Sequence, residues 1–151
     1  MSVRSPRLIA GAALLAGGVV AAPLVAVPAM AADGGRPLST MLTGEAEAPK
    51  PGDIDGEGSA SLRVNVGKRQ VCYELTVSGI APAVAAHIHE APPGVAGPVV
   101  APLDAPTSGV SSGCTAISRD LAKDIVRNPE DYYVNVHNAE FPGGALRGQL
   151  G

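Results

Sequence analysis

The sequence predicts an all-β protein, an antiparallel β-sandwich or barrel with one short helix in a connection. Three observations lead to this prediction. Segments 61–67, 71–77 and 132–138 alternate apolar and polar residues with a period of two, which is typical of strands with one buried face. The 19 glycines and 14 prolines separate such segments with turn signals. Only the segment 118–128 has the apolar spacing of a helix.

The first residues are expected to lie outside this fold. Arg4 and Arg7 precede a long apolar run that ends in the small-residue motif "AMA", a pattern typical of a secretory signal peptide covering residues 1–31. A retained membrane anchor is the alternative, although prolines and glycines interrupt the run. Residues 32–37 are then expected to form a disordered leader, and residues 38–151 a single domain.

The predicted strands follow one another along the domain. A weaker first strand covers 38–44, the two alternating segments come next, then the segment around "AAHIHE", a run at 97–103, and the strands at 132–138 and 145–150. Gly67 gives the first hairpin turn a permissive backbone. Prolines confine the run 97–103 to a sheet edge, and the rest of 91–113 is expected to be loop.

The helix prediction rests on its end signals as well as on its period. Ser118 is placed as the N-cap and Asp120 lies in the first turn. Arg127 suits the last turn, and Pro129 ends the helix at Asn128. One side of this helix is apolar. Its residues are Leu121, Ala122, Ile125 and Val126.

Charge and cysteine content limit the environment and the partners. Without the two arginines of the leader, 9 basic and 14 acidic side chains remain, a net charge of −5 with no basic cluster, which argues against nucleic acid and anionic membranes. Export makes a disulfide between Cys72 and Cys114 the default expectation, worth roughly 4 kcal/mol on the chain-entropy model. Two free thiols or two metal ligands are the alternatives.

The three histidines of the chain form the main candidate site. His87 and His89 lie two apart, so in a strand they share one face while Ile88 points into the core. The same alternation turns His137 away from its apolar neighbours. If the two strands are neighbours, the three imidazoles could bind one copper or zinc ion with an open position. The alternative is a structural polar cluster in which each ring bonds to Asn135, Asn138, Glu90 or a carbonyl.

Arg147 is the second candidate functional residue. It follows the turn "FPGG", in which Gly143 or Gly144 can take a positive φ, and it faces the same side as His137 if their strands pair. It could guide an anion to a metal, or it could be a structural arginine that bonds to loop carbonyls or to Glu140.

Taken together, these motifs resemble the CHRD domain, the chordin-type module of many secreted bacterial proteins. The resemblance extends from about Leu38 to Leu150, through "LTGEAEAP", "GEGSASLRV", "YELTVSGI", "AAHIHEAPPGVAGPVVAPL" and "NPEDYYVNVHNAEFPGGALRGQL" in that order. It implies a secreted β-sandwich and little about activity. The growth-factor binding of chordin itself is not carried over to this chain.

A more distant similarity is to the copper–zinc superoxide dismutases, which are also β-sandwiches. "HIHE", "AGP", the outward His137 and the late Arg147 before "GQLG" are similar to their skeleton. The similarity implies copper ligands at His87, His89 and His137, with Arg147 as the anion guide. The chain departs from the pattern where Val99 follows "AGP", because the family has its metal-bridging histidine there, and the zinc histidines are absent.

These readings lead to an Ig-like or superoxide-dismutase-like fold and to three functional hypotheses. The first, which we favour, is a secreted, non-catalytic CHRD-domain module that binds an extracellular protein or glycan, with no membrane span after cleavage. The second is a copper-binding protein, with an oxidoreductase of superoxide-dismutase type as its enzymatic form. The third is a purely structural envelope or matrix component.

Overall fold

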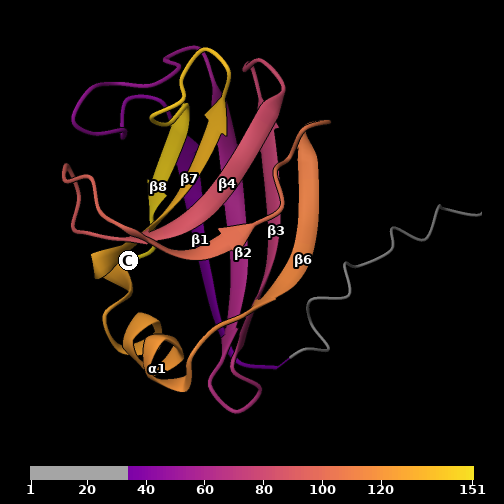
Figure 1. Cartoon of the computed structure of the whole chain (residues 1–151), viewed down its shortest axis with the longest axis vertical. Helices are drawn as coiled ribbons and strands as arrows, with labels where there is room; N and C mark the ends of the chain where they lie inside the picture. Colours follow the sequence, from indigo (N-terminus) through magenta and orange to yellow (C-terminus); the bar gives the residue numbers. More distant parts are fainter. Residues whose placement is uncertain (1–33) are drawn as a thin grey trace, which may run out of the picture.

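The structure, a computed structural model, describes residues 34–151, so the expected signal peptide lies outside the described residues. The described chain is all-β with one short helix, as the sequence predicts (Figure 1). Its elements are β1 (Arg36–Thr43), β2 (Glu57–Asn65), β3 (Gln70–Ser78), β4 (Ala83–Glu90), β5 (Val99–Leu103), β6 (Val110–Ala116), α1 (Arg119–Arg127), η2 (Pro129–Asp131), β7 (Tyr132–Asn138) and β8 (Leu146–Gln149).

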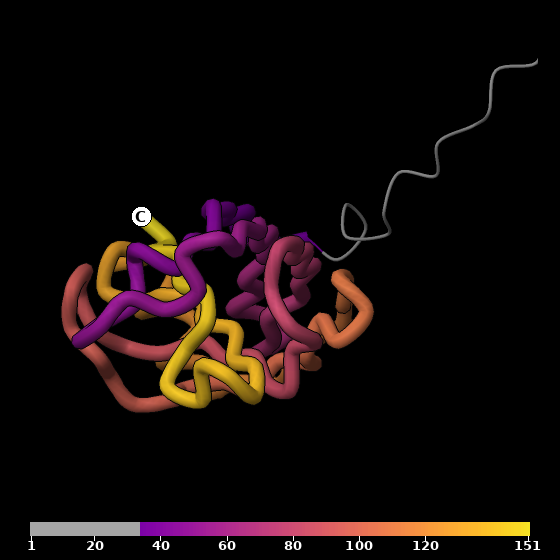
Figure 2. Tube along the Cα trace, turned by 90° about the horizontal axis from the view of Figure 1, so that it is seen from above, coloured from indigo at the N-terminus to yellow at the C-terminus, as the bar shows by residue number. Residues whose placement is uncertain are grey.

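The strands form one antiparallel sheet in the order β5-β4-β7-β8-β1-β2-β3-β6. The sheet curves round a common interior, as the view from above shows (Figure 2). Its two edge strands, β5 and β6, lie close together, and Ser111 Oγ donates to Asp104 O just beyond β5 at 2.7 Å. The fold is therefore a nearly closed barrel.

The alternating residues of the strands fill the interior of the barrel. In β2 and β3, Leu62 and Leu75 are at most 1% exposed, while Glu74 between the inward positions is only half-buried. Ile88 of β4 and Val134 of β7 are fully buried from the other side. Burial of such a continuous apolar face is the main stabilising contribution to a barrel of this size.

Helix α1 covers the lower end of the barrel as drawn in Figure 1. Its Ser118 N-cap accepts a hydrogen bond from Leu121 N at 3.0 Å, as predicted. The fully buried Ala122 and Ile125 dock it onto the core, and Asp124 Oδ2 accepts a 2.6 Å bond from the Tyr132 hydroxyl. In the part of the chain that the structure describes, no helix is long and apolar enough to cross a membrane.

The disulfide between Cys72 and Cys114 is formed, and it joins directly opposed residues of β3 and β6. Strand β6 itself was expected to be mostly loop, because a segment rich in serine and glycine shows no apolar alternation. It is a strand because it pairs with β3 along its whole length and is crosslinked to it. Non-local pairing here outweighs weak intrinsic strand propensity.

Two local expectations need adjustment. Strand β1 begins at Arg36, so the last two residues of the expected leader belong to the sheet, where Arg36 and Pro37 pair with Val64 and Arg63. In the first hairpin turn, the positive φ falls on Arg69, at 55°, and not on Gly67.

Candidate metal centre

The three histidines lie on the outer face of two neighbouring strands. His87 and His89 project from β4, and His137 projects from β7, which pairs directly with β4. Ile88, between the first two histidines, and Val136, directly before the third, point inward and are fully buried. The adjacency of the two strands, on which the sequence prediction depended, is therefore confirmed.

The imidazoles converge closely enough to share one ion. One ring nitrogen from each histidine lies within 4.8 Å of the other two. His87 Nδ1 is 3.1 Å from His137 Nε2, and the ring centroids of His87 and His89 are 5.6 Å apart. Small movements of side chains would bring such nitrogens to the roughly 2.0–2.1 Å bond lengths typical of a zinc-type site.

Backbone carbonyls determine which nitrogen of two rings faces the centre. His89 Nδ1 lies 2.9 Å from Gly97 O, and His137 Nδ1 lies 3.0 Å from Pro142 O. Because a carbonyl oxygen only accepts hydrogen bonds, both Nδ1 atoms must carry the proton, which leaves the lone pair on Nε2 in both rings. Histidines that bind a metal usually donate the N–H of their other ring nitrogen to a carbonyl or carboxylate in this way.

His89 Nε2 is the most informative atom of the cluster. It is buried and has no hydrogen-bond partner among the described residues, and the whole residue is 8% exposed. A buried acceptor without a partner carries a free-energy cost of about 1–3 kcal/mol. A bound cation at this position would remove that cost.

The pKa values of all three histidines are lowered, and burial is the largest cause for each. For His87, the charges of His137 and His89 add to the effect of burial. For His89, the bond to Gly97 raises the pKa and the charge of Arg147 lowers it. For His137, the bond to Pro142 raises the pKa and the charge of His89 lowers it. Neutral imidazole is the form that binds metal ions, so these shifts favour ligation.

A stack of three side chains supports His89. The Tyr133 ring lies parallel to the His89 ring, with centroids 4.8 Å apart and an angle of 11°. The Arg147 guanidinium lies over the Tyr133 ring, 3.5 Å from its centroid. The stack holds the plane of the imidazole and adds a cation–π contact.

The same side chains fix the loop that carries Gly97. Arg147 donates to Val95 O at 2.7 Å and to Pro92 O at 2.9 Å, and Gln149 Nε2 donates to Ala91 O at 2.8 Å. Gly97 N donates to the Tyr133 hydroxyl at 3.1 Å. The loop 91–98 is thus attached to the sheet at several points. This order places the Gly97 carbonyl where it orients His89.

Arg147 itself is only 1% exposed. Its guanidinium donates to the two loop carbonyls and to Gln149 Oε1 at 3.0 Å. Of the two alternatives from the sequence, these contacts favour the structural arginine that bonds to loop carbonyls.

A buried carboxyl group, Glu47, lies against Asn135 of β7 and was not singled out from the sequence. It is 8% exposed, and its Oε1 accepts a hydrogen bond from Asn135 Nδ2. Burial raises its pKa to about 7, against the opposing effects of Arg147, Asn135 and the Ala48 backbone. Nothing in "GEAEAP" distinguishes Glu47 from the exposed Glu45, because burial here depends on long-range loop packing.

Tyr133 and Gln149 were also missed as supporting residues. Tyr133 lies on the outward face of β7 together with His137. Its place in the alternation, two and four residues before Asn135 and His137, predicts this face, but no local pattern predicts its contact with His89.

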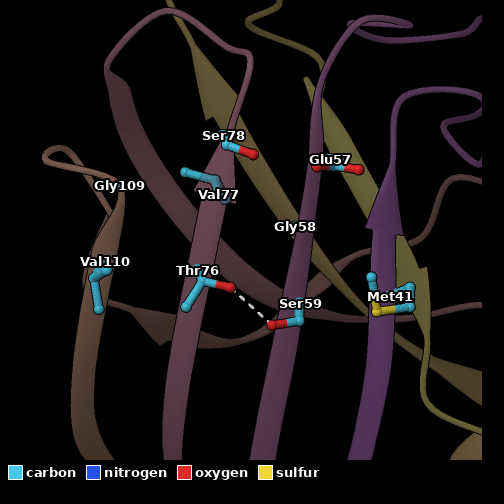
Figure 3. Close-up of a pocket in the computed structure, with 9 residues that line it drawn as sticks. All are labelled: Met41, Glu57, Gly58, Ser59, Thr76, Val77, Ser78, Gly109 and Val110. Carbon is cyan, nitrogen blue, oxygen red and sulfur yellow. Dashed lines mark hydrogen bonds between the residues drawn. The ribbon is translucent and has the colours of Figure 1, made fainter.

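A hollow of about 410 Å³ lies elsewhere on the barrel and offers different chemistry (Figure 3). It extends over β1, β2, β3 and β6, where Met41 and Val110 flank a 2.8 Å hydrogen bond between Ser59 and Thr76. Glu57 is the one ionisable side chain in its lining. No set of convergent ligands comparable with the histidine cluster lines this hollow.

The comparison with known proteins agrees with the family resemblance that the sequence motifs indicate. The model of the CHRD-domain family matches residues 38–150, nearly the whole of the part that the structure describes. No curated protein and no solved structure matches the chain.

Proposed function

This chain belongs to the CHRD-domain family, and from that premise we propose that it is an exported, non-catalytic module that binds copper through His87, His89 and His137. The single observation that carries the proposal is His89 Nε2, a buried nitrogen with no partner among the described residues, on a ring that converges with two further imidazoles. An export route is supported by the disulfide, which forms in oxidising compartments.

The described contacts support a separate role for each ring in the proposed site. His89 and His137 would ligate through Nε2, since the Gly97 and Pro142 carbonyls hold their Nδ1 protons. In the absence of metal, His87 Nδ1 donates to His137 Nε2, because that nitrogen has no proton of its own. For His87 to ligate through the same nitrogen, its proton would move to Nε2, so the neutral ring would change tautomer without net proton release at neutral pH.

Copper is the metal that the donor set favours most. Three neutral imidazoles suit copper and zinc, and copper(II) binds more tightly than the other divalent first-row ions at a site of a given type. The lowered pKa values of the three histidines keep the donors unprotonated at neutral pH.

The experiment is a metal assay of the exported protein. We would purify it without a histidine tag or chelators, offer copper or zinc, remove excess metal and measure bound metal per chain. We expect one copper per chain, and loss of that copper in His89→Ala. Glu90→Gln, which changes the exposed neighbour of His89, is the matched control and should retain the metal.

Two results would contradict the proposal. One is a wild-type chain that retains neither metal after both have been offered. The other is a triple His→Ala variant that retains as much metal as the wild type. Either would favour the structural reading of the cluster, and a fall in the melting temperature of metal-free His87→Ala would agree with it.

A second candidate function is a copper-dependent oxidoreductase of superoxide-dismutase type. It is favoured by one observation: His87 and His137 are only half-buried, so a small molecule has a route to the ligands. Superoxide consumption by copper-loaded protein, compared with loaded His87→Ala and with free chelated copper, tests it. A rate no higher than that of chelated copper would leave the non-catalytic module as the function.

A further inference from the structure

A cavity of about 470 Å³ lies between the loop that follows β1 and the turn between β7 and β8. This volume is in the range of sites for small molecules. Its walls are largely apolar, and two carboxyl groups belong to its lining. The main wall residues are Pro49, Pro51, Phe141 and Pro142, with Glu47 and Glu140 as the acidic ones.

The two segments that form the cavity are held in place by hydrogen bonds. Gly52 N donates to Gly44 O at 2.8 Å, and Asp53 N donates to Ala145 O at 2.9 Å. Asn138 Oδ1 accepts from Phe141 N at 2.8 Å, which fixes the turn. The cavity is therefore built by ordered loops that are tied to the barrel.

Glu47 is the buried charged group of this cavity. Its carboxylate accepts from Asn135, and it lies so close to the turn that a Cβ on Gly144 would be 2.5 Å from Glu47 Cδ. The charge of Arg147 acts on it, but the guanidinium donates to the carbonyls of Pro92 and Val95. Among the described residues, Glu47 has no ion pair.

A buried carboxylate without an ion-pair partner is unfavourable, and a cation brought to it from solvent would stabilise the charged form. The pKa of Glu47, raised to about 7 mainly by burial, reports the same desolvation. Lys50 also belongs to the lining, but its side chain is exposed to solvent. No described side chain forms an ion pair with the Glu47 carboxylate, so a cationic ligand would neutralise it.

We propose that this cavity binds the ammonium group of a primary alkylamine against the Glu47 carboxylate, with the alkyl chain along Phe141 and the prolines. An ammonium group suits the site better than a guanidinium, because Asn135 and the Ala48 backbone already donate to the carboxylate and occupy part of the fork that a bidentate partner requires. The aromatic ring and the proline walls suit an alkyl chain next to a cation.

Two sources share this chemistry, a free alkylamine and the side chain of a peptide lysine. n-Butylammonium represents the first, and Nα-acetyl-lysine methylamide represents the second. n-Butanol is the neutral control of the same length. The proposal does not depend on the metal centre, so the test uses metal-free protein, in which paramagnetic copper does not broaden the signals.

The experiment follows the backbone amide signals of Ala48, Gly143 and Gly144 by NMR during titration with each probe. We expect saturable shifts with n-butylammonium, with a dissociation constant of the order of 1 mM, and none with n-butanol. Binding of the lysine derivative as well would extend the ligand class to peptide lysines, and its failure would restrict the class to free amines. Glu47→Gln should weaken amine binding by about tenfold or more, and Glu45→Gln, at an exposed glutamate, should not.

The proposal is overturned if n-butylammonium gives no saturable shift at these amides, or if n-butanol binds equally well. It is also overturned if folded Glu47→Gln binds the amine as tightly as the wild type. Should that variant fail to fold, the comparison of amine and alcohol on the wild-type chain still decides, because it isolates the contribution of the positive charge.

Discussion

Among single residues, Arg147 supports His89 through the Tyr133 ring and through the loop carbonyls. We predict that Arg147→Lys lowers the free energy of unfolding by roughly 2–3 kcal/mol, since an ammonium cannot serve both buried carbonyls in the fork geometry. Copper affinity should fall by about 10- to 100-fold, as is typical when an outer partner of a ligand is lost. Urea unfolding and a copper titration measure the two effects.

Arg119→Lys is the control for this prediction, because Arg119 is exposed at the start of α1. It should change neither quantity. An Arg147→Lys variant with unchanged copper affinity would show that the stack and the loop do not position His89.

Glu47 makes a second residue-scale prediction, on how stability depends on pH. Its folded-state pKa is raised from 4.5 to about 7, so the folded protein holds the proton more tightly than the unfolded chain. This stabilisation is fully present below pH 4.5 and is lost as the pH rises through about 7. The histidines act in the opposite direction, because their pKa values are lowered in the folded state. Their contribution to the stability of the fold is lost as the pH falls below 6.5.

Glu47→Gln should therefore remove the first contribution and leave the second. We therefore expect the difference in unfolding free energy, metal-free variant minus wild type, to increase as the pH rises from 5 to 8. The increase should be of the order of 3 kcal/mol. Chemical unfolding of both proteins across this range measures the difference. Parallel stability curves for the two proteins would contradict the buried position of this carboxyl group.

At the scale of elements, the turn between β7 and β8 joins the candidate metal centre to the cavity. Gly144 has a φ of 144°, and a Cβ there would lie 2.5 Å from Asn135 Nδ2 and from Glu47 Cδ. A Cβ on the preceding Gly143 would have no atom within 4 Å. We predict that Gly144→Ala destabilises the fold by about 1–3 kcal/mol, whereas Gly143→Ala has little effect.

The same substitution tests whether the turn supports ligation, because Pro142 O in this turn orients His137. Copper affinity should fall in Gly144→Ala and stay unchanged in Gly143→Ala. Equal melting temperatures for the two variants would mean that the close approach of Gly144 to Glu47 is not a constraint in solution.

Strand β6 provides a further prediction at this scale, because its one lateral partner strand is β3, to which the disulfide joins it. Replacing both Cys72 and Cys114 by alanine should lower the free energy of unfolding by roughly 4 kcal/mol. Amide hydrogen exchange should then increase first in β6. Unchanged protection of β6 in the double variant would show that backbone pairing alone holds this edge.

At the scale of the whole molecule, the sequence predicts more of the fold than of the site. Period-two alternation identified β2, β3 and β7, and cap signals identified α1, because these depend on neighbours in the chain. Strand β6 was missed, and so was the strand order, because both are set by pairing between distant segments.

Prediction of the candidate site from the sequence has the same limit, because part of the site depends on contacts between distant segments. The faces of the three histidines followed from alternation, and their convergence required only that β4 and β7 be neighbours. The stack under His89, the loop held by Arg147 and the buried Glu47 depend on register and on loop packing. No local pattern in the sequence encodes these contacts.

The most direct test of the central claim is electron paramagnetic resonance of the copper(II)-loaded protein, made with ¹⁵N-labelled histidine and with natural abundance nitrogen. We predict one copper per chain whose hyperfine pattern shows three imidazole nitrogens, and two in His87→Ala, where His89 and His137 remain. A spectrum with mainly oxygen ligands, or one that is the same in wild type and in the triple His→Ala variant, would contradict a copper centre on the outer face of β4 and β7.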